Sequence, residues 1–171
     1  MASNLELRFA LEDDVAIVLQ LIKELAEYER LAHAVVATEE VLRETLFGPR
    51  PYAEAILAFV DGQPVGFALF FHNYSTFLAS PGIYLEDLFV RPEFRGLGIG
   101  KKLMSAVAAL AVERGCGRFE WAVLDWNEPS IAFYEKLGAK PQSDWTVMRL
   151  TGEELLKVGG RNPHLDPISG A

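Results

Sequence analysis

The first part of the chain switches between two hydrophobic periods. In Leu5–Phe9 every second residue is apolar, which is typical of a strand. Apolar residues then recur every three or four positions between Val15 and Leu25, and this spacing predicts a helix with one buried face. The acidic run Glu12–Asp14 suits the start of that helix, because the helix dipole is positive there. A strand followed by an amphipathic helix is therefore expected.

The middle of the chain predicts a hairpin and then a third strand. Ala55–Val60 and Val65–Phe71 have the composition of strands, and Asp61-Gly62 between them is a favourable hairpin turn. A loop from His72 to Pro81 is expected to lead into a strand at Tyr84–Val90.

The remaining segments continue the alternation of helix and strand. Expected helices cover Thr38–Phe47, with Thr38 as N-cap, then Gly100–Gly115, Asn127–Leu137 and a short turn at Glu153–Lys157; expected strands cover Phe119–Leu124 and Thr146–Leu150. No linker interrupts the pattern, so a mixed α/β fold in a single domain over residues 1–160 is expected. Residues 161–171 are rich in proline, glycine and polar residues and are expected to form a flexible tail.

Composition narrows the class of protein. Half of the residues are hydrophobic, which suits one domain with a sizeable core. No apolar run approaches the ~20 residues of a membrane helix, and no secretory signal is seen, so a cytoplasmic protein without a membrane partner is expected. The single cysteine, Cys116, excludes an internal disulfide and suits a reducing compartment. It lies far in sequence from any obvious histidine partner, so we interpret it as a filler at a helix end.

The net charge of −8 argues against a nucleic-acid partner, because phosphate binding needs a concentrated basic face. The same charge is compatible with a cationic substrate. His33, His72 and His164 show no metal-ligand spacing, and no metal is expected.

The segment Tyr84–Lys101, YLEDLFVRPEFRGLGIGK, joins an apolar strand to a glycine loop that opens a helix. Such a loop suits a phosphate group, because glycines let the backbone approach and amides at a helix N-terminus point at the anion. A dinucleotide loop would need glycine at Lys101, and a Walker loop would need Ser or Thr at Lys102, so neither fits. What remains is Arg-x-x-Gly-x-Gly from Arg95 to Gly100; a plain surface turn is the alternative.

This pattern after an apolar strand resembles the acetyl-CoA loop of the GNAT N-acetyltransferase superfamily. A second segment, WNEPSIAFYEKLGA from Trp126 to Ala139, resembles the helix that closes over the cofactor in that superfamily. Together with ELAEYE and YLEDLFV, the motifs are most similar to the spermidine/spermine and thialysine N-acetyltransferase branch. The resemblance extends from Leu5 to Val158.

The resemblance implies a twisted, mixed, mostly antiparallel sheet that is splayed between strands 4 and 5 and flanked by helices. It also implies acetyl-CoA as the acyl donor, no metal, and a homodimer. The cofactor-binding residues that it implies are Leu88, Phe89, Val90, Arg95, Gly96, Leu97, Gly98, Ile99, Gly100, Lys101, Asn127, Ser130 and Tyr134.

The same resemblance implies Glu86 as a general base that acts through water and Tyr134 as the general acid toward the thiolate. Solvated carboxylates at a strand end and a tyrosine of an amphipathic helix are the plain alternatives. Asn127 and Ser130 could equally cap their helix.

Amine recognition is assigned by resemblance to Tyr28, Glu29 and Asp87, with a solvated helix end as the alternative for the first two. After Ala139 the chain reads KPQSDW, where the polyamine enzymes carry a longer acidic run. This difference favours thialysine or another small amine over a polyamine.

The expected activity is therefore direct acetyl transfer to the primary amine of a small cationic substrate. An alkylamine with a pKa near ~10.4 is almost wholly protonated at neutral pH, so the site must remove a proton. Two alternatives stay open: a GNAT enzyme that acts on a protein N-terminus or lysine, and a non-catalytic acyl-CoA sensor.

Overall fold

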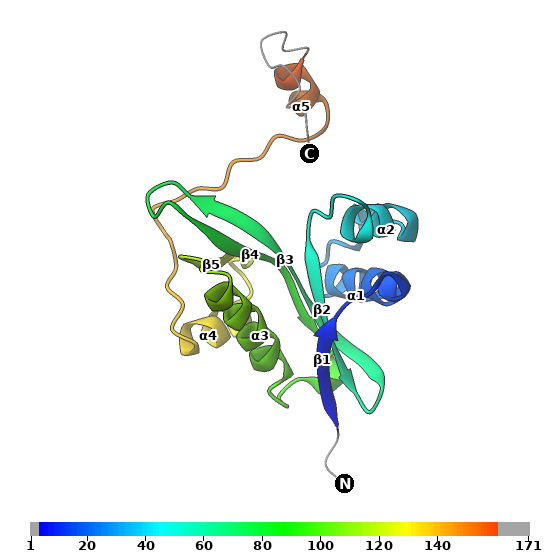
Figure 1. Cartoon of the computed structure of the whole chain (residues 1–171). Coiled ribbons are helices and arrows are strands. Elements are labelled where there is room, and N and C mark those ends of the chain that lie inside the picture. The colour runs from blue at the N-terminus through cyan, green and yellow to red at the C-terminus, as the bar shows by residue number, and fades with distance from the viewer. Residues whose placement is uncertain (1–3, 161–171) are drawn as a thin grey trace. The chain divides into compact units, whose positions relative to one another are not determined.

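A computed structural model describes residues 4–160, and Figure 1 shows its ribbon. Two compact units make up the chain, Met1–Leu124 and Asp125–Ala171. The single domain expected over 1–160 stays a prediction, and the expected tail at 161–171 lies outside the described residues.

The first unit contains β1 (Leu5–Phe9), η1 (Glu12–Asp14), α1 (Val15–Tyr28), η2 (Ala32–Ala34), α2 (Glu39–Phe47), β2 (Glu54–Val60), β3 (Gln63–Ser75), β4 (Ser80–Val90), η3 (Pro92–Phe94), α3 (Ile99–Glu113) and β5 (Phe119–Trp121). The second unit contains α4 (Glu128–Lys136) and α5 (Gly152–Gly159).

The strands of the first unit form one mixed sheet in the order β1-β2-β3-β4-β5. Strands β1 to β4 pair antiparallel, and β5 pairs parallel with β4. The β4–β5 pairing covers only Ile83–Leu85, whereas β4 continues to Val90. The expected mixed, mostly antiparallel sheet is confirmed, and the pairing of strands 4 and 5 ends where the predicted splay begins.

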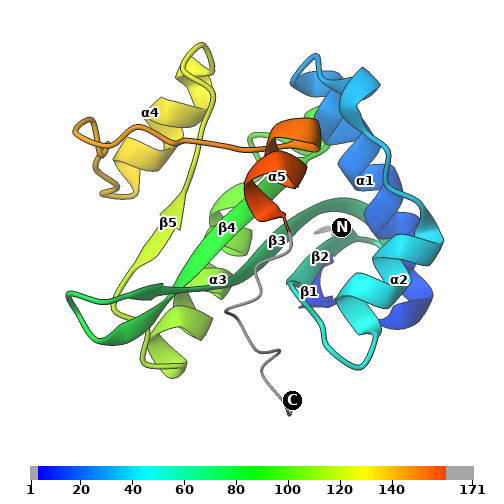
Figure 2. The ribbon, with the colours of Figure 1, turned by 90° about the horizontal axis from the view of Figure 1, so that it is seen from above.

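Helices cover both faces of this sheet. Helices α1 and α2 lie on one face and α3 on the other, as the views in Figures 1 and 2 show. Burial of apolar side chains between helices and sheet provides the main driving force for this arrangement. The core on the α1–α2 face includes Val15, Val18, Leu21, Leu57, Phe67 and Phe89. Leu103 and Val107 of α3 are fully buried.

Local signals predicted several element boundaries correctly. The Thr38 hydroxyl accepts a hydrogen bond from the Val41 amide at 3.3 Å, so Thr38 caps α2 as expected. The loop expected over 72–81 is shorter, because 72–75 pair with 80–83 and extend the hairpin. The strand expected at Thr146–Leu150 is wrong. A strand needs a neighbour for its backbone hydrogen bonds, and no strand between residues 4 and 160 pairs with this segment.

Candidate active site

Strand β4 contains a β-bulge at Glu86. Leu69 of β3 pairs with Asp87 and the next residue, Phe70, pairs with Leu85, so Glu86 has no partner residue in β3. Leu69 packs against the α1–α2 core, and Asp87 opposite it therefore faces the α1 side of the sheet. The strict alternation of side chains that is typical of a strand is therefore interrupted at Glu86. Bulges re-aim side chains and are frequent beside active sites.

Three carboxylates beside the bulge, Glu29, Glu86 and Asp87, make an acidic cluster in which the charges of Glu86 and Glu29 both act on Asp87. Glu86 is exposed, whereas Asp87 and Glu29, the C-cap residue of α1, are half-buried. Burial, followed by the charges of Glu86 and Glu29, raises the pKa of Asp87 to about 7. Burial also raises the pKa of Glu29. Across residues 4–160 no cation or hydrogen-bond donor lowers either pKa, so the cluster has no internal counter-ion.

Tyr28 and Arg95 stack on each other beside this cluster. The Cζ atom of Arg95 lies 4.4 Å from the centre of the Tyr28 ring and 5.7 Å from that of Phe89, which are cation–π distances. The Nε–H group of Arg95 also donates to the Val90 carbonyl at 2.9 Å. The sequence placed Arg95 with the cofactor and Tyr28 with the amine. The structure instead links the loop after β4 directly to the end of α1.

A surface cleft of about 520 Å³ runs beside Tyr28, between α1 and the end of β4. Its shape is fixed by Arg91, which makes two 2.8 Å bonds to the carboxylate of Glu24 and donates to the Pro64 carbonyl at 2.7 Å. Sequence reasoning missed this clamp, because 67 positions separate Arg91 and Glu24 and no motif joins them. The cleft is lined by Gln20, Glu24, Glu27, Tyr28, Phe89, Arg91, Pro92 and Glu93.

The N-terminus of α3 has the features of an anion site. Gly96 and Gly98 have φ values of +79° and +78°, and an added Cβ would meet nothing within 4 Å, so glycine is needed for the backbone conformation. The Lys102 amide donates to the Gly98 carbonyl at 3.0 Å, which leaves the amides of 99–101 without helical partners. The first turn of α3 carries no acidic residue, as in α1, so no carboxylate of that turn competes with an anion. These residues fit a pyrophosphate group.

The strand residues expected to meet the cofactor flank this loop. Leu88, Phe89 and Val90 pair with β3 on one side, and β5 does not extend alongside them on the other. On that side the Val90 carbonyl already accepts from Arg95, and the rest of this backbone is available to a ligand. Leu97 is exposed and Ile99 is buried in α3, so Ile99 offers only its backbone.

Three further predicted residues belong to the second unit. The Oδ1 atom of Asn127 accepts from the Ser130 amide at 3.3 Å, so Asn127 caps α4, and any additional role toward a cofactor stays a prediction. Tyr134 is half-buried in α4, with its ring centre 5.2 Å from that of Phe133. Its role as general acid also stays a prediction.

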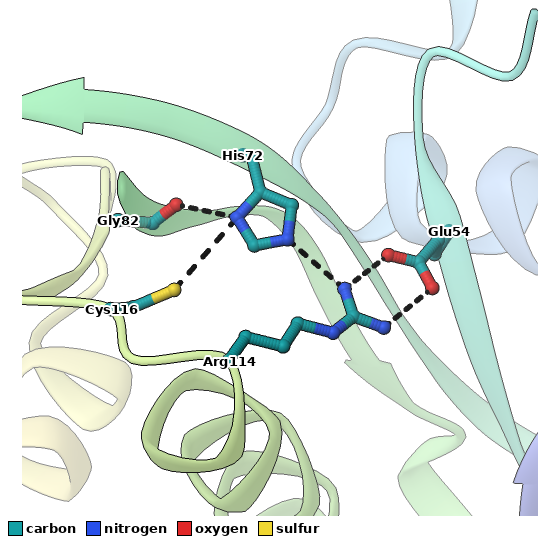
Figure 3. A network of polar contacts seen from close by, with 5 residues as sticks. All are labelled: Glu54, His72, Gly82, Arg114 and Cys116. Atoms are coloured by element: carbon teal, nitrogen blue, oxygen red, sulfur yellow. Dashed lines mark hydrogen bonds and ion pairs between the residues drawn. The ribbon is translucent and has the colours of Figure 1, made fainter. Parts of the chain in front are cut away.

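Cys116 has a histidine neighbour after all, and Figure 3 shows the network that holds it. The Cys116 sulfur lies 3.8 Å from Nδ1 of His72. Nδ1 also lies 3.1 Å from the Gly82 carbonyl, which can only accept, and Nε2 lies 3.1 Å from Arg114, which can only donate. Neutral His72 therefore carries its proton on Nδ1 and offers no lone pair to the thiol. Arg114 is held in turn by Glu54.

Within 4–160 no three His, Cys, Asp or Glu side chains gather where they could hold a metal ion. In the same range no helix has the length and apolarity to cross a membrane.

Comparisons with known proteins agree on the family and the fold. A family model described as acetyltransferase (GNAT) family matches residues 19–139. Thialysine N-epsilon-acetyltransferase of Sus scrofa is 40% identical over 94% of this chain and 100% of its own length. The L-ornithine N5-acetyltransferase NATA1 of Arabidopsis thaliana is 35% identical over 91% of this chain and 88% of its own length. An integron cassette protein from the mobile metagenome of V. cholerae superposes with a TM-score of 0.78 and 25% identity, over 92% of this chain and 98% of that one.

Proposed function

This chain belongs to the acetyltransferase (GNAT) family, and we propose that it transfers an acetyl group from acetyl-CoA directly to the primary amine of a small cationic substrate. The family resemblance and the N-acetyltransferase class expected from the sequence are confirmed. The names of its relatives point to thialysine-like and ornithine-like amines. The observation that carries the proposal is an acidic cluster without internal counter-ion beside a glycine loop that suits a phosphate.

Acetyl-CoA, when bound, supplies an acetyl thioester that an amine can attack. The amides of the Gly96–Lys101 segment at the start of α3 would hold its pyrophosphate, with Arg95 at the edge of the loop. The open backbone of Leu88–Val90 would hold its pantetheine arm. Asn127 and Ser130 would contribute from the start of α4.

The acidic cluster would receive the amine. A cationic ammonium supplies the charge that Glu29 and Asp87 lack inside the protein, and Tyr28 adds an aromatic face. Glu86 is exposed at the bulge, which suits a base that works through water. Tyr134 would return a proton to the departing thiolate.

Direct transfer is favoured over an acyl-enzyme. The sole cysteine has no activating base, because the lone pair of neutral His72 faces Arg114 instead of the thiol. The acetyl group therefore has no evident nucleophile in the described chain other than the substrate amine.

We also propose a cytoplasmic homodimer. A single cysteine suits a reducing compartment. Around the turn of the β3–β4 hairpin Tyr74, Phe77 and Leu78 are 60%, 96% and 57% exposed, and an apolar patch of this kind suits contact with a second copy. Sedimentation equilibrium of the wild type and of Phe77→Ser tests the dimer.

The experiment that tests the activity is thiol release from acetyl-CoA with thialysine, ornithine, lysine, spermidine, putrescine and a lysine peptide as acceptors. Selective turnover of one small amine is the expected result. Tight coenzyme A binding without turnover of any acceptor would contradict the proposal and favour a sensor. Turnover of the peptide alone would favour a protein acceptor.

A further inference from the structure

We infer that Asp87, beyond attracting the amine, takes the proton from the substrate ammonium directly and hands it to solvent past Glu86. This inference rests on the proposed function and departs from it at one point: the role of base moves from Glu86 to Asp87, so that one carboxylate both binds the amine and accepts its proton. The positions and surroundings of Asp87 and Glu86 favour these separate roles.

The bulge separates the two acids by environment. Asp87 is half-buried on the α1 side of the sheet, near Glu29 at the end of α1. Glu86 is exposed and has no partner residue in β3. An ammonium that enters between α1 and β4 therefore meets Asp87 in a partly dry environment, while Glu86 stays in contact with water. The inner acid is suited to receive the proton and the outer acid to release it.

The groups around Asp87 do not neutralise its charge. Glu86 on β4 and Glu29 on α1 are acidic, and Leu69 of β3, directly opposite, is apolar. Arg95 is the nearby cation of the loop, but its guanidinium lies over the Tyr28 ring and binds the Val90 carbonyl. The substrate itself is the cation that completes the cluster.

The strength of Asp87 as a base also fits. Burial and the neighbouring carboxylates raise its pKa to about 7. An amine of pKa ~10.4 is about 3 pKa units more basic than such a group, against more than 6 for an ordinary aspartate. The equilibrium for proton transfer is thus about a thousandfold less unfavourable than with an ordinary aspartate, and a base works best when its pKa lies near the working pH.

The step balances as a simple proton transfer. One N–H bond of the ammonium breaks, its electron pair stays on nitrogen, and the proton bonds to a carboxylate oxygen of Asp87. The neutral amine can then attack the acetyl carbonyl. Asp87 loses the proton to water at Glu86 before the next turnover.

The test is the pH dependence of kcat/KM from pH 5.5 to 9 for the wild type, Asp87→Asn, Glu86→Gln and Glu29→Gln, with thialysine as acceptor. The wild type should gain activity through a transition near pH 7. Asp87→Asn should lose about 10²- to 10⁴-fold in kcat and lose this transition. Glu86→Gln should keep the transition but shift it to lower pH, because the Glu86 charge raises the pKa of Asp87. Glu29→Gln should shift it in the same direction by less.

A second acceptor separates proton transfer from binding. With a less basic amine, part of which is already neutral, the kcat loss of Asp87→Asn should shrink, whereas a loss of attraction alone would appear in KM. Asp87→Glu should restore part of kcat. Unchanged coenzyme A affinity by calorimetry shows that the variants are folded.

Two results would overturn the inference. One is an Asp87→Asn variant that keeps the transition and changes only KM; the other is a Glu86→Gln variant that loses the transition. Failure of the wild type to acetylate any amine would instead contradict the proposed function, and calorimetry with coenzyme A would still report a folded protein.

Discussion

Two sets of partly buried carboxylates in this molecule differ in whether an arginine faces them. In the first set, an arginine hydrogen bond is the largest cause that lowers the carboxylate pKa. In the acidic cluster, burial raises the pKa of Asp87 and Glu29, and no arginine opposes it within residues 4–160. The first set comprises Arg8–Asp14, Arg91–Glu24 and Arg114–Glu54.

The difference separates structural charges from charges kept for a ligand. The three arginine pairs join elements far apart in the chain or fix a turn. In each pair the arginine neutralises the carboxylate and donates hydrogen bonds to it, so no ligand is needed. A half-buried carboxylate without a partner instead costs stability whenever it is ionised. Groups with such a perturbed pKa that lie beside a cleft are candidates for a functional site, because an external cation can supply the missing charge. The comparison predicts opposite responses to mutation in the two sets.

The largest effect is expected from removing the partner of Asp14, the most buried of the paired carboxylates. Arg8→Met leaves Asp14, whose side chain is 9% exposed, without its guanidinium partner, and should lower the free energy of unfolding by about 3 kcal/mol. The melting temperature should fall by about 9 °C. The matched control is Arg43→Met, which breaks the exposed 3.4 Å contact with Glu12 and should cost less than ~0.5 kcal/mol. Equal melting temperatures for the two variants would show that pairing with arginine does not stabilise the first set of carboxylates.

Asp87→Asn should do the reverse and stabilise the protein at pH 8 by about 2 kcal/mol, which is half of the ~4 kcal/mol that the full shift would give, because Asp87 is only half-buried and solvent screens part of the cost. Because the folded-state pKa of Asp87 is raised to about 7, its ionisation destabilises the fold progressively as pH rises from about 4 to 7. Asparagine removes that cost, so the gain should be present at pH 8 and nearly absent at pH 4. Urea unfolding at both values measures it.

Asp14→Asn is the control for the direction of this stability change. The pKa of Asp14 is lowered, so its ionised form stabilises the fold above its ordinary pKa near 3.8, and the contribution disappears as pH falls through the lowered value. This variant should be destabilised at pH 8 and at pH 5. A destabilised Asp87→Asn at pH 8 would place Asp87 in the structural set.

Local elements of the fold could be predicted from the sequence because their signals are local. The period of Leu5–Phe9, the cap at Thr38 and the glycine at Gly98 each act within a few residues. The strand wrongly expected at 146–150 has a suitable composition, but pairing with another strand decides whether it forms.

The site could be predicted only in part for the same reason. Motif resemblance named Glu29, Glu86 and Asp87, and the structure does bring these three together. It could not reveal the bulge at Glu86, which depends on the register against β3. Contacts such as that of Arg91 with Glu24 join residues 67 positions apart, and the hydrophobic periodicity of the sequence does not predict them.

Glu54→Gln should have a smaller effect on stability and none on the amine. The pair with Arg114 is 29–38% exposed, so its loss should lower the free energy of unfolding by about 1 kcal/mol and the melting temperature by about 3 °C. Because this pair and His72 form a network of their own, the KM for the amine should not change. A raised KM would show that the paired set also serves the substrate.

The smallest effect should come from Glu29→Gln, which should raise the KM for the amine about threefold, or ~0.65 kcal/mol, with kcat nearly unchanged at pH 8. Glu29 contributes charge to the cluster without receiving the proton, so its loss weakens attraction more than chemistry. Glu44→Gln on the exposed surface of α2 removes the same charge elsewhere and should leave KM unchanged. If both variants raise KM equally, the net charge of −8 attracts the amine; if only Glu29→Gln does, the position of the unpaired carboxylates matters.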